Sequence, residues 1–115
     1  MIPTAGLNKI RDWLAGTSTT KPLYIALGDG TDAEALTDTQ LQNELDRKSV
    51  TVTRTIRNVT YESLWDDTEL NGEEITELGL LSAVSTGTLF IRSVFSPISK
   101  NAAILLQVDV TIMVN

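Results

Sequence analysis

The residues best suited to chemistry in this chain are carboxylates, and they gather in two acidic segments. Residues 29–46 and residues 62–77 together hold 13 of the 15 acidic side chains. Asp29, Asp32 and Glu34 suggest a calcium site, because hard cations bind clustered oxygen ligands. The Asp spacing differs from the EF-hand pattern, and no glutamate follows at the twelfth position. We interpret the segment as a solvated turn followed by the acidic first turn of a helix.

The second acidic segment offers paired carboxylates of the kind used in glycoside hydrolysis. That chemistry requires two carboxylates in different environments across a cleft. The acids of residues 66–74 instead crowd one polar stretch that contains an Asn71-Gly72 turn. A solvated loop is therefore the better interpretation, and we expect both acidic segments to face solvent and to keep free subunits soluble.

Other catalytic constellations are missing from the sequence. Gly28-Asp29-Gly30 follows an expected strand, but it lacks the third glycine of a dinucleotide fingerprint and the Gly-Lys-Ser/Thr of a P-loop. The chain has no His and no Cys, which excludes disulfides, thiol catalysis, Cys/His zinc sites and His acid–base catalysis. Tyr24, Tyr61 and Trp65 lie in strand patterns, where aromatic residues usually belong to the core. We predict a protein that is not an enzyme and has no catalytic residue, cofactor or metal.

Composition places the chain among globular domains. It has 115 residues, of which 42% are hydrophobic and 21% charged, so we expect a single domain over residues 1–115. The net charge of −6 disfavours binding to nucleic acid phosphates. The apolar runs are too short for a transmembrane helix, and the N-terminus shows no signal-peptide pattern, so we expect no membrane partner.

The first expected element is an N-terminal helix. Thr4 is a good N-cap, and Leu7, Ile10 and Leu14 form an amphipathic stripe that Trp13 widens. Gly16 suits the left-handed position after a helix end.

A second short helix is expected near residues 36–45. Thr37 and Gln40 have the spacing of a capping box, and Leu36 and Leu41 have the spacing of a hydrophobic staple. Leu45 adds an apolar contact one turn after Leu41.

Alternating apolar residues predict strands over residues 23–27, 50–56, 59–65, 75–81, 88–95 and 104–114. Residues 50–65 indicate a hairpin with one face buried and a turn at Arg57-Asn58. Pro97 is expected to end the fifth strand. The remaining turns are assigned to Gly28, Gly30, Gly72 and Gly87.

These elements predict a β-rich α+β fold, with a mainly antiparallel sheet or sandwich of about six strands, an N-terminal helix and a second short helix. The last third of the chain is nearly neutral and carries apolar residues on both faces of its strands. Such strands are covered on both faces, either by the N-terminal helix or by another subunit. The candidate contact residues are Trp13, Phe90, Val94, Leu105 and Met113.

Several sequence blocks resemble short structural proteins of tailed bacteriophages, of the tail fibre or tail-collar-like type. The blocks are residues 6–16 (GLNKIRDWLAG), 22–31 (PLYIALGDGT), 41–45 with Arg47, 71–81, 87–92 and 96–100. They occur in this order over nearly the whole chain, which makes the set more specific than any one block.

The resemblance implies a non-enzymatic virion subunit, made in the host cytoplasm, whose partners are copies of itself and other phage virion proteins. A tail position as collar, adaptor or fibre base is the first expectation, and a capsid decoration (cement) protein is the alternative. Both roles use symmetric copies with largely preformed contact surfaces. A small carbohydrate-binding module is the alternative from another class, and it requires an exposed aromatic platform such as Trp65.

Overall fold

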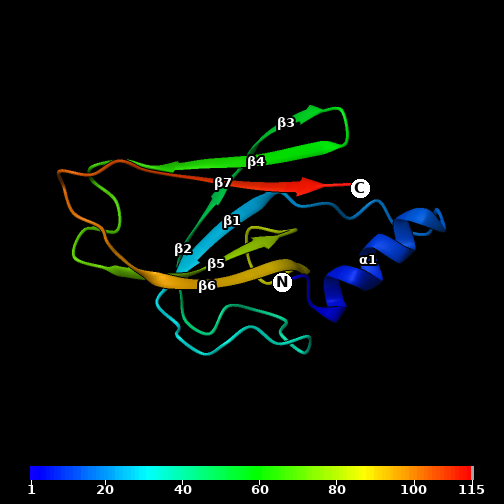
Figure 1. Cartoon of the computed structure of the whole chain (residues 1–115), viewed down its shortest axis with the longest axis horizontal. Coiled ribbons are helices and arrows are strands. Elements are labelled where there is room, and N and C mark those ends of the chain that lie inside the picture. The colour runs from blue at the N-terminus through cyan, green and yellow to red at the C-terminus, as the bar shows by residue number, and fades with distance from the viewer. Residues whose placement is uncertain (115) are drawn as a thin grey trace.

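The computed structural model describes residues 1–114 and contains two antiparallel sheets and one N-terminal helix (Figure 1). Helix α1 spans Thr4–Leu14. Sheet A has the strand order β2-β1-β5-β6, and sheet B has the order β3-β4-β7. The strands are β1 Tyr24–Gly28, β2 Glu44–Ser49, β3 Thr51–Thr55, β4 Asn58–Trp65, β5 Glu74–Leu81, β6 Leu89–Ser99 and β7 Leu106–Met113. The expected β-rich α+β fold is confirmed, with seven strands where about six were expected.

The main hydrophobic core lies between the two sheets. Strands β4 and β7 alternate in burial, because one face of sheet B packs on sheet A and the other meets solvent. Strand β5 is buried along most of its length, as befits a central strand. The buried members of this core are Ile25, Leu27, Tyr61, Trp65, Ile75, Leu80, Phe90 and Val110.

A second, smaller cluster covers the other face of sheet A. Its members are Ala26, Leu41, Leu81 and Leu89. Leu41 comes from the long connection between β1 and β2, so a loop rather than a helix lies over this face. Residues 29–43 contain no helix, and the second helix expected near residues 36–45 is therefore wrong.

The second helix fails because its backbone groups have other partners. The backbone N–H groups of Gln42 and Asn43 donate to the buried side chain of Glu77. The following residues form β2, which pairs with β1 at the edge of sheet A. Tertiary contacts thus override a local sequence pattern that has the spacing of both a capping box and a hydrophobic staple.

Helix α1 is confirmed, but its ends and its faces differ from expectation. Pro3, not Thr4, is the N-cap, and no side chain caps the helix. Gly16 has the expected left-handed conformation, with φ of 72°. The apolar stripe is largely uncovered, since Leu7 is 47% and Leu14 is 87% exposed.

Two further strand expectations are corrected. In the β3–β4 hairpin every residue of β3 is exposed, because the hairpin extends beyond sheet A and nothing covers it (Figure 1). Its turn residue in the left-handed conformation is Arg57, with φ of 68°.

Strand β6 continues through Pro97 to Ser99, beyond the residue that was expected to end it. It is an edge strand whose register with β5 shifts between Ile75 and Glu77, so a residue without N–H is tolerated there.

Candidate assembly surface

A fully buried carboxylate in β5 fixes the connection between β1 and β2. Glu77 has no exposed surface. Its Oε1 accepts the backbone N–H of Gln42 at 2.9 Å and Nε of Arg92 at 3.0 Å. Its Oε2 accepts the backbone N–H groups of Gly30 at 2.7 Å and Asn43 at 2.9 Å. One side chain therefore anchors both ends of a long irregular segment.

The Arg92 guanidinium extends this anchor. Arg92 is 2% exposed, and its Nη1 forms an ion pair with Oδ2 of Asp38 at 3.1 Å. Its Nη2 donates to the backbone carbonyl of Asp32 at 2.9 Å. Glu34 adds a contact from the same connection, since its Oε1 accepts the backbone N–H of Val94 at 2.7 Å. The first acidic segment is thus bound to sheet A instead of facing solvent throughout, which corrects that expectation.

The Glu77–Arg92 centre stabilises the fold and is not arranged for catalysis. Burial alone would raise the pKa of Glu77, but N–H donation from Asn43 and Gln42 and the contact with Arg92 outweigh it. They hold the pKa below its ordinary value of 4.5. Each carboxylate oxygen already accepts two hydrogen bonds, so the group remains ionised and is not available as an acid or base.

Glu77 and Arg92 were not among the predicted site residues, although the sequence carries a signal for them. Glu77 interrupts the apolar residues 75–81, and Arg92 interrupts the apolar residues 89–95 of the next strand. Arg92 pairs in register with Gly79, two residues from Glu77 and on the same face. Single opposite charges in consecutive buried strands predict an ion pair, because an unpaired buried charge is costly.

Glycine is required at positions 28 and 30 because neighbouring atoms approach the backbone too closely for a side chain. A Cβ on Gly28 would lie 2.7 Å from Oε2 of Glu77, and a Cβ on Gly30 would lie 2.7 Å from Oε1 of Gln42. Gly28 is the last residue of β1 and neither glycine has a positive φ, so the predicted turn at these positions is wrong, and the space taken by the Glu77 carboxylate is what requires glycine there. Gly72 and Gly87 have the left-handed conformation expected of turn residues, with φ of 86° and 83°.

A buried lysine holds the second acidic segment. Lys100 is 1% exposed, and its Nζ donates to the carbonyl of Asp66 at 2.8 Å, to Oδ1 of Asn71 at 3.1 Å and to the carbonyl of Asn101 at 3.1 Å. All three ammonium hydrogens are used. The loop between β4 and β5 is thereby tied to the end of β6.

A cavity of about 430 Å³ lies between the end of the β1–β2 connection and the turn at residues 84–87. Its one cation, Arg47, forms an ion pair with Glu44 and donates to the carbonyls of Ala83 and Thr86. No aromatic side chain lines it. The cavity therefore offers neither a free charge nor a stacking platform for a ligand.

The aromatic residues in strand patterns belong largely to the interior, as expected. Trp65 has no exposed surface, and its Nε1 donates to Asp46. Tyr61 is 8% exposed, and burial raises its pKa above 10.0. Trp65 is therefore not available as a carbohydrate platform.

The candidate contact residues divide between the surface and the interior. Leu105 and Met113 are 64% and 57% exposed. Trp13 is partly exposed and stacks on Phe90, with ring centroids 5.5 Å apart. Phe90 is 3% exposed because α1 covers it within the subunit, so it is not available as the subunit-contact residue that the sequence suggested. Val94 is half-buried.

The face of sheet B that points away from sheet A is called here the outer face. It carries Thr60, Glu62 and Leu64 from β4, Gln107, Asp109, Thr111 and Met113 from β7, and Leu105 just before β7. Leu64 is 46% exposed, so three large apolar residues lie at the two ends of a polar, threonine-rich surface. Strand β7 is also an edge strand, paired with β4 on one side only.

An apolar groove runs beside the same edge. Its volume is about 260 Å³, and it opens between β6 and β7, where the edges of the two sheets separate. Phe95 and Ile98 line it from sheet A, and Leu106 and Val108 line it from sheet B. The edge of the sandwich is therefore open and apolar.

No family model, no curated protein and no solved structure matches this chain. Among residues 1–114 no group of three or more acidic side chains is placed to hold a metal ion. Within residues 1–114, no helix is long and apolar enough to cross a membrane.

Proposed function

We propose that the chain is a non-enzymatic structural subunit of a tailed bacteriophage particle, placed at the tail as a collar, adaptor or fibre base. The observation that carries the proposal is the exposed apolar edge of sheet B. Leu105 and Met113 remain more than half exposed in the folded subunit, at the two ends of β7, the strand that lines one side of the open groove. Exposed apolar surface next to a free strand edge is typical of a protein contact.

The rigid body behind this edge supports the same role. The Glu77–Arg92 ion pair fixes the β1–β2 connection, and the buried Lys100 fixes the loop between β4 and β5. A preformed surface of this kind associates with little loss of conformational entropy. The sequence resemblance supplies the class of particle.

The test is genetic. A stop codon in the gene, in the phage that carries it, is expected to give particles with defective tails when they are viewed by electron microscopy. Wild-type protein supplied in trans restores them, and the double variant Leu105→Asp/Met113→Asp does not. The variant must keep the wild-type circular dichroism spectrum, so that a folding defect is separated from a contact defect.

The same experiment separates the alternatives. Intact tails on fragile heads assign the protein to capsid decoration instead. Normal particles with normal infectivity refute a structural role of either kind. The carbohydrate-binding alternative has lost its predicted platform, because Trp65 is buried.

A further inference from the structure

Two carboxylates face each other on the outer face of sheet B. Glu62 in β4 and Asp109 in β7 are direct partners in register, and both are exposed. Like charges placed directly opposite each other across two strands destabilise a sheet. No Lys or Arg of the described chain forms an ion pair with either, and Gln107 is the one side chain that donates to Asp109.

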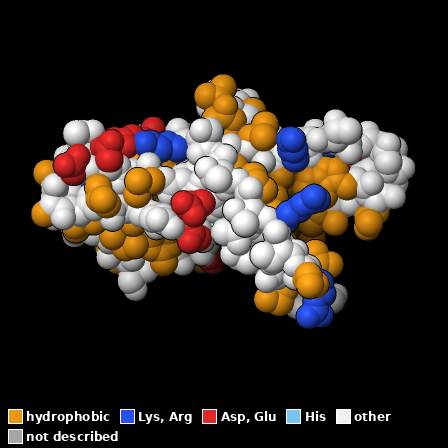
Figure 2. Space-filling view, turned by 90° about the horizontal axis from the view of Figure 1, so that it is seen from above, with side chains coloured by type: hydrophobic (Ala, Val, Ile, Leu, Met, Phe, Trp, Pro, Cys, Tyr) orange, Lys and Arg blue, Asp and Glu red, His pale blue; other side chains and the backbone are white. Residues whose placement is uncertain are grey.

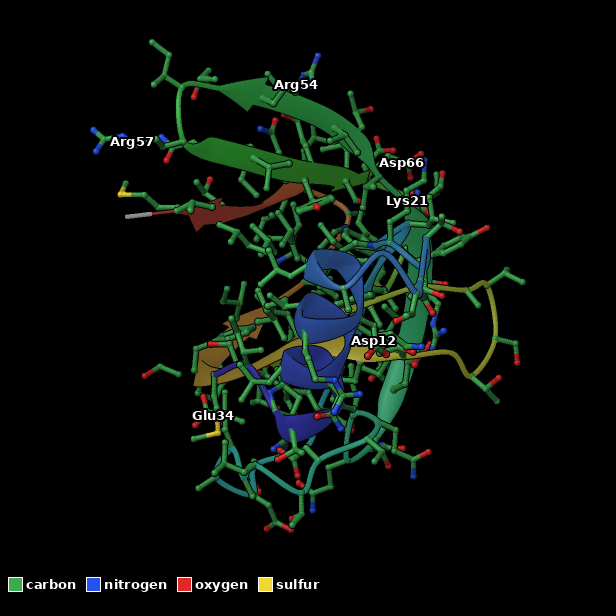
Figure 3. All side chains as sticks on the ribbon, turned by 90° about the vertical axis from the view of Figure 1, so that its right-hand side faces the viewer. Asp12, Lys21, Glu34, Arg54, Arg57 and Asp66 are labelled. Atoms are coloured by element: carbon green, nitrogen blue, oxygen red, sulfur yellow. The ribbon has the colours of Figure 1, made fainter. Side chains whose placement is uncertain are left out.

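Two cations at the far end of the same sheet lack acceptors. Arg54 and Arg57 lie on the β3–β4 hairpin, and both are exposed and point away from the body of the molecule (Figure 3). Neither donates a side-chain hydrogen bond to any residue in the described part of the chain. Between them, Ile56 is 88% exposed at the tip of the hairpin.

The arginines cannot neutralise the carboxylates of their own subunit. Arg54 is in register with Val59, which packs against the core between the sheets, so its side chain leaves the face opposite to that of Glu62. Glu62 also lies four residues along β4 from Asn58, at the hairpin turn, a distance of about 13 Å.

Charge is unevenly distributed on one face of the molecule. On the face shown in Figure 2, acidic side chains lie over the left and the centre, with a basic side chain beside those on the left, and the charged side chains visible on the right are Lys and Arg. The right-hand end is the one that holds α1 and the hairpin turn (Figure 1).

We infer that the tip of the β3–β4 hairpin docks on the outer face of sheet B of a second copy of this chain. The guanidinium groups of Arg54 and Arg57 bind the Glu62–Asp109 pair, and Ile56 packs beside the exposed apolar residues of that face. Leu64 lies two residues along β4 from Glu62, about 7 Å away on the same face. It is therefore placed to contact Ile56 when the neighbouring arginines bind the carboxylates. This deepens the proposed function and rests on it for its biological setting.

The contact joins two different patches, so it is heterologous and repeats from copy to copy. Heterologous contacts close into rings or extend into filaments, whereas a twofold dimer uses one patch twice. A hairpin tip is a small contact, and we expect a dissociation constant on the order of 0.1–1 mM for a single pair. Such contacts become stable through ring closure.

The test is the mass of the purified chain by light scattering and sedimentation at about 1 mM, in low and in high salt. The wild-type mass should rise with concentration at low salt and fall towards the monomer at high salt. The variant Arg54→Glu/Arg57→Glu should remain monomeric. Lys9→Glu/Lys21→Glu makes the same change in net charge and should associate like the wild type.

The acceptor face has its own pair of variants. Glu62→Lys/Asp109→Lys should be monomeric, and the control Asp32→Lys/Asp67→Lys should associate. A mixture of Glu62→Lys/Asp109→Lys with the hairpin variant should form a one-to-one complex, because the hairpin of the first meets an unaltered face on the second.

A wild-type protein that stays monomeric at low salt overturns the inference, and so does a control variant that loses association as completely as its partner. The virion role is judged separately. A monomeric protein that is present in particles refutes the hairpin contact alone. A protein that associates as described but is absent from particles refutes the virion role alone.

Discussion

Oε1 of Glu77 lies 3.0 Å from Nε of Arg92, and the two residues are 0% and 2% exposed. Removing one partner of a buried ion pair leaves the other charge uncompensated, at a cost of about 3–5 kcal/mol. Glu77→Gln should therefore lower the free energy of unfolding by about this amount in urea denaturation. Glu74→Gln, an exposed change on the same strand, should alter it by less than about 0.5 kcal/mol. Equal losses in the two variants would contradict the assignment.

The same ion pair predicts a pH dependence. The folded-state pKa of Glu77 lies below 4.5, so the unfolded chain binds more protons in acid and this contribution to stability is lost as pH falls. The difference in unfolding free energy between the wild type and Glu77→Gln should be constant above about pH 5 and should shrink below pH 4.5. Urea titrations from neutral pH into acid measure it. A difference that grows in acid would contradict the account.

Gly30 has no room for a side chain. A Cβ there would collide with Glu77 and Gln42, so Gly30→Ala should cost about 3 kcal/mol through displacement of the β1–β2 connection. Gly72 has open space around it and a φ of 86°, so Gly72→Ala should cost about 1 kcal/mol from backbone strain alone. Thermal denaturation gives the order of the two variants, and the reverse order would refute the close approach of the Glu77 carboxylate.

Local opening near Lys100 is testable by hydrogen exchange. Lys100→Met removes two hydrogen bonds to the loop that precedes β5, at Asp66 and Asn71, and one to the carbonyl of Asn101. The amide of Gly72, which donates to the carbonyl of Lys100, should then exchange at least about tenfold faster, since each lost bond contributes on the order of 1 kcal/mol. Lys21→Met, at an exposed position, should leave that amide unchanged. Unchanged exchange in Lys100→Met would mean that the loop is held by other contacts.

Replacing one of the two opposed carboxylates, Glu62 and Asp109, should stabilise the subunit, unlike the changes above. Asp109→Lys places a cation opposite Glu62, so it should raise the melting temperature of the isolated subunit by about 1–3 °C. Asp67→Lys makes the same charge change on an exposed loop and should have a smaller effect. A fall in melting temperature for Asp109→Lys would show that the pair is already neutralised within the subunit.

The parts of the fold that depend on local pattern were predictable from the sequence. The alternation from Leu106 to Ile112 locates β7 and its inner face, and Gly16 marks the end of α1. The exposure of Leu105 and Met113 follows from the same alternation. These features require no knowledge of distant residues.

The rest depends on contacts between residues far apart in sequence. Residues 36–45 have the local pattern of a helix, yet Glu77, more than 30 positions away, binds their backbone N–H groups. The extension of the β3–β4 hairpin beyond sheet A is equally invisible locally, because its alternation is the same whether or not another sheet lies beneath it. That Arg54 and Glu62 lie on opposite faces of the hairpin, and so cannot form an ion pair within one subunit, follows only from the register of β3 with β4.

The central claim, a structural subunit of the tail, is tested most directly by the number of copies in a purified particle. Quantitative mass spectrometry against the major capsid protein gives that number. The account predicts a small count set by the symmetry of the tail, such as a single ring. A ratio near one copy per capsid subunit would contradict the tail position and place the protein on the shell. Complete absence from the particle would contradict the structural role itself.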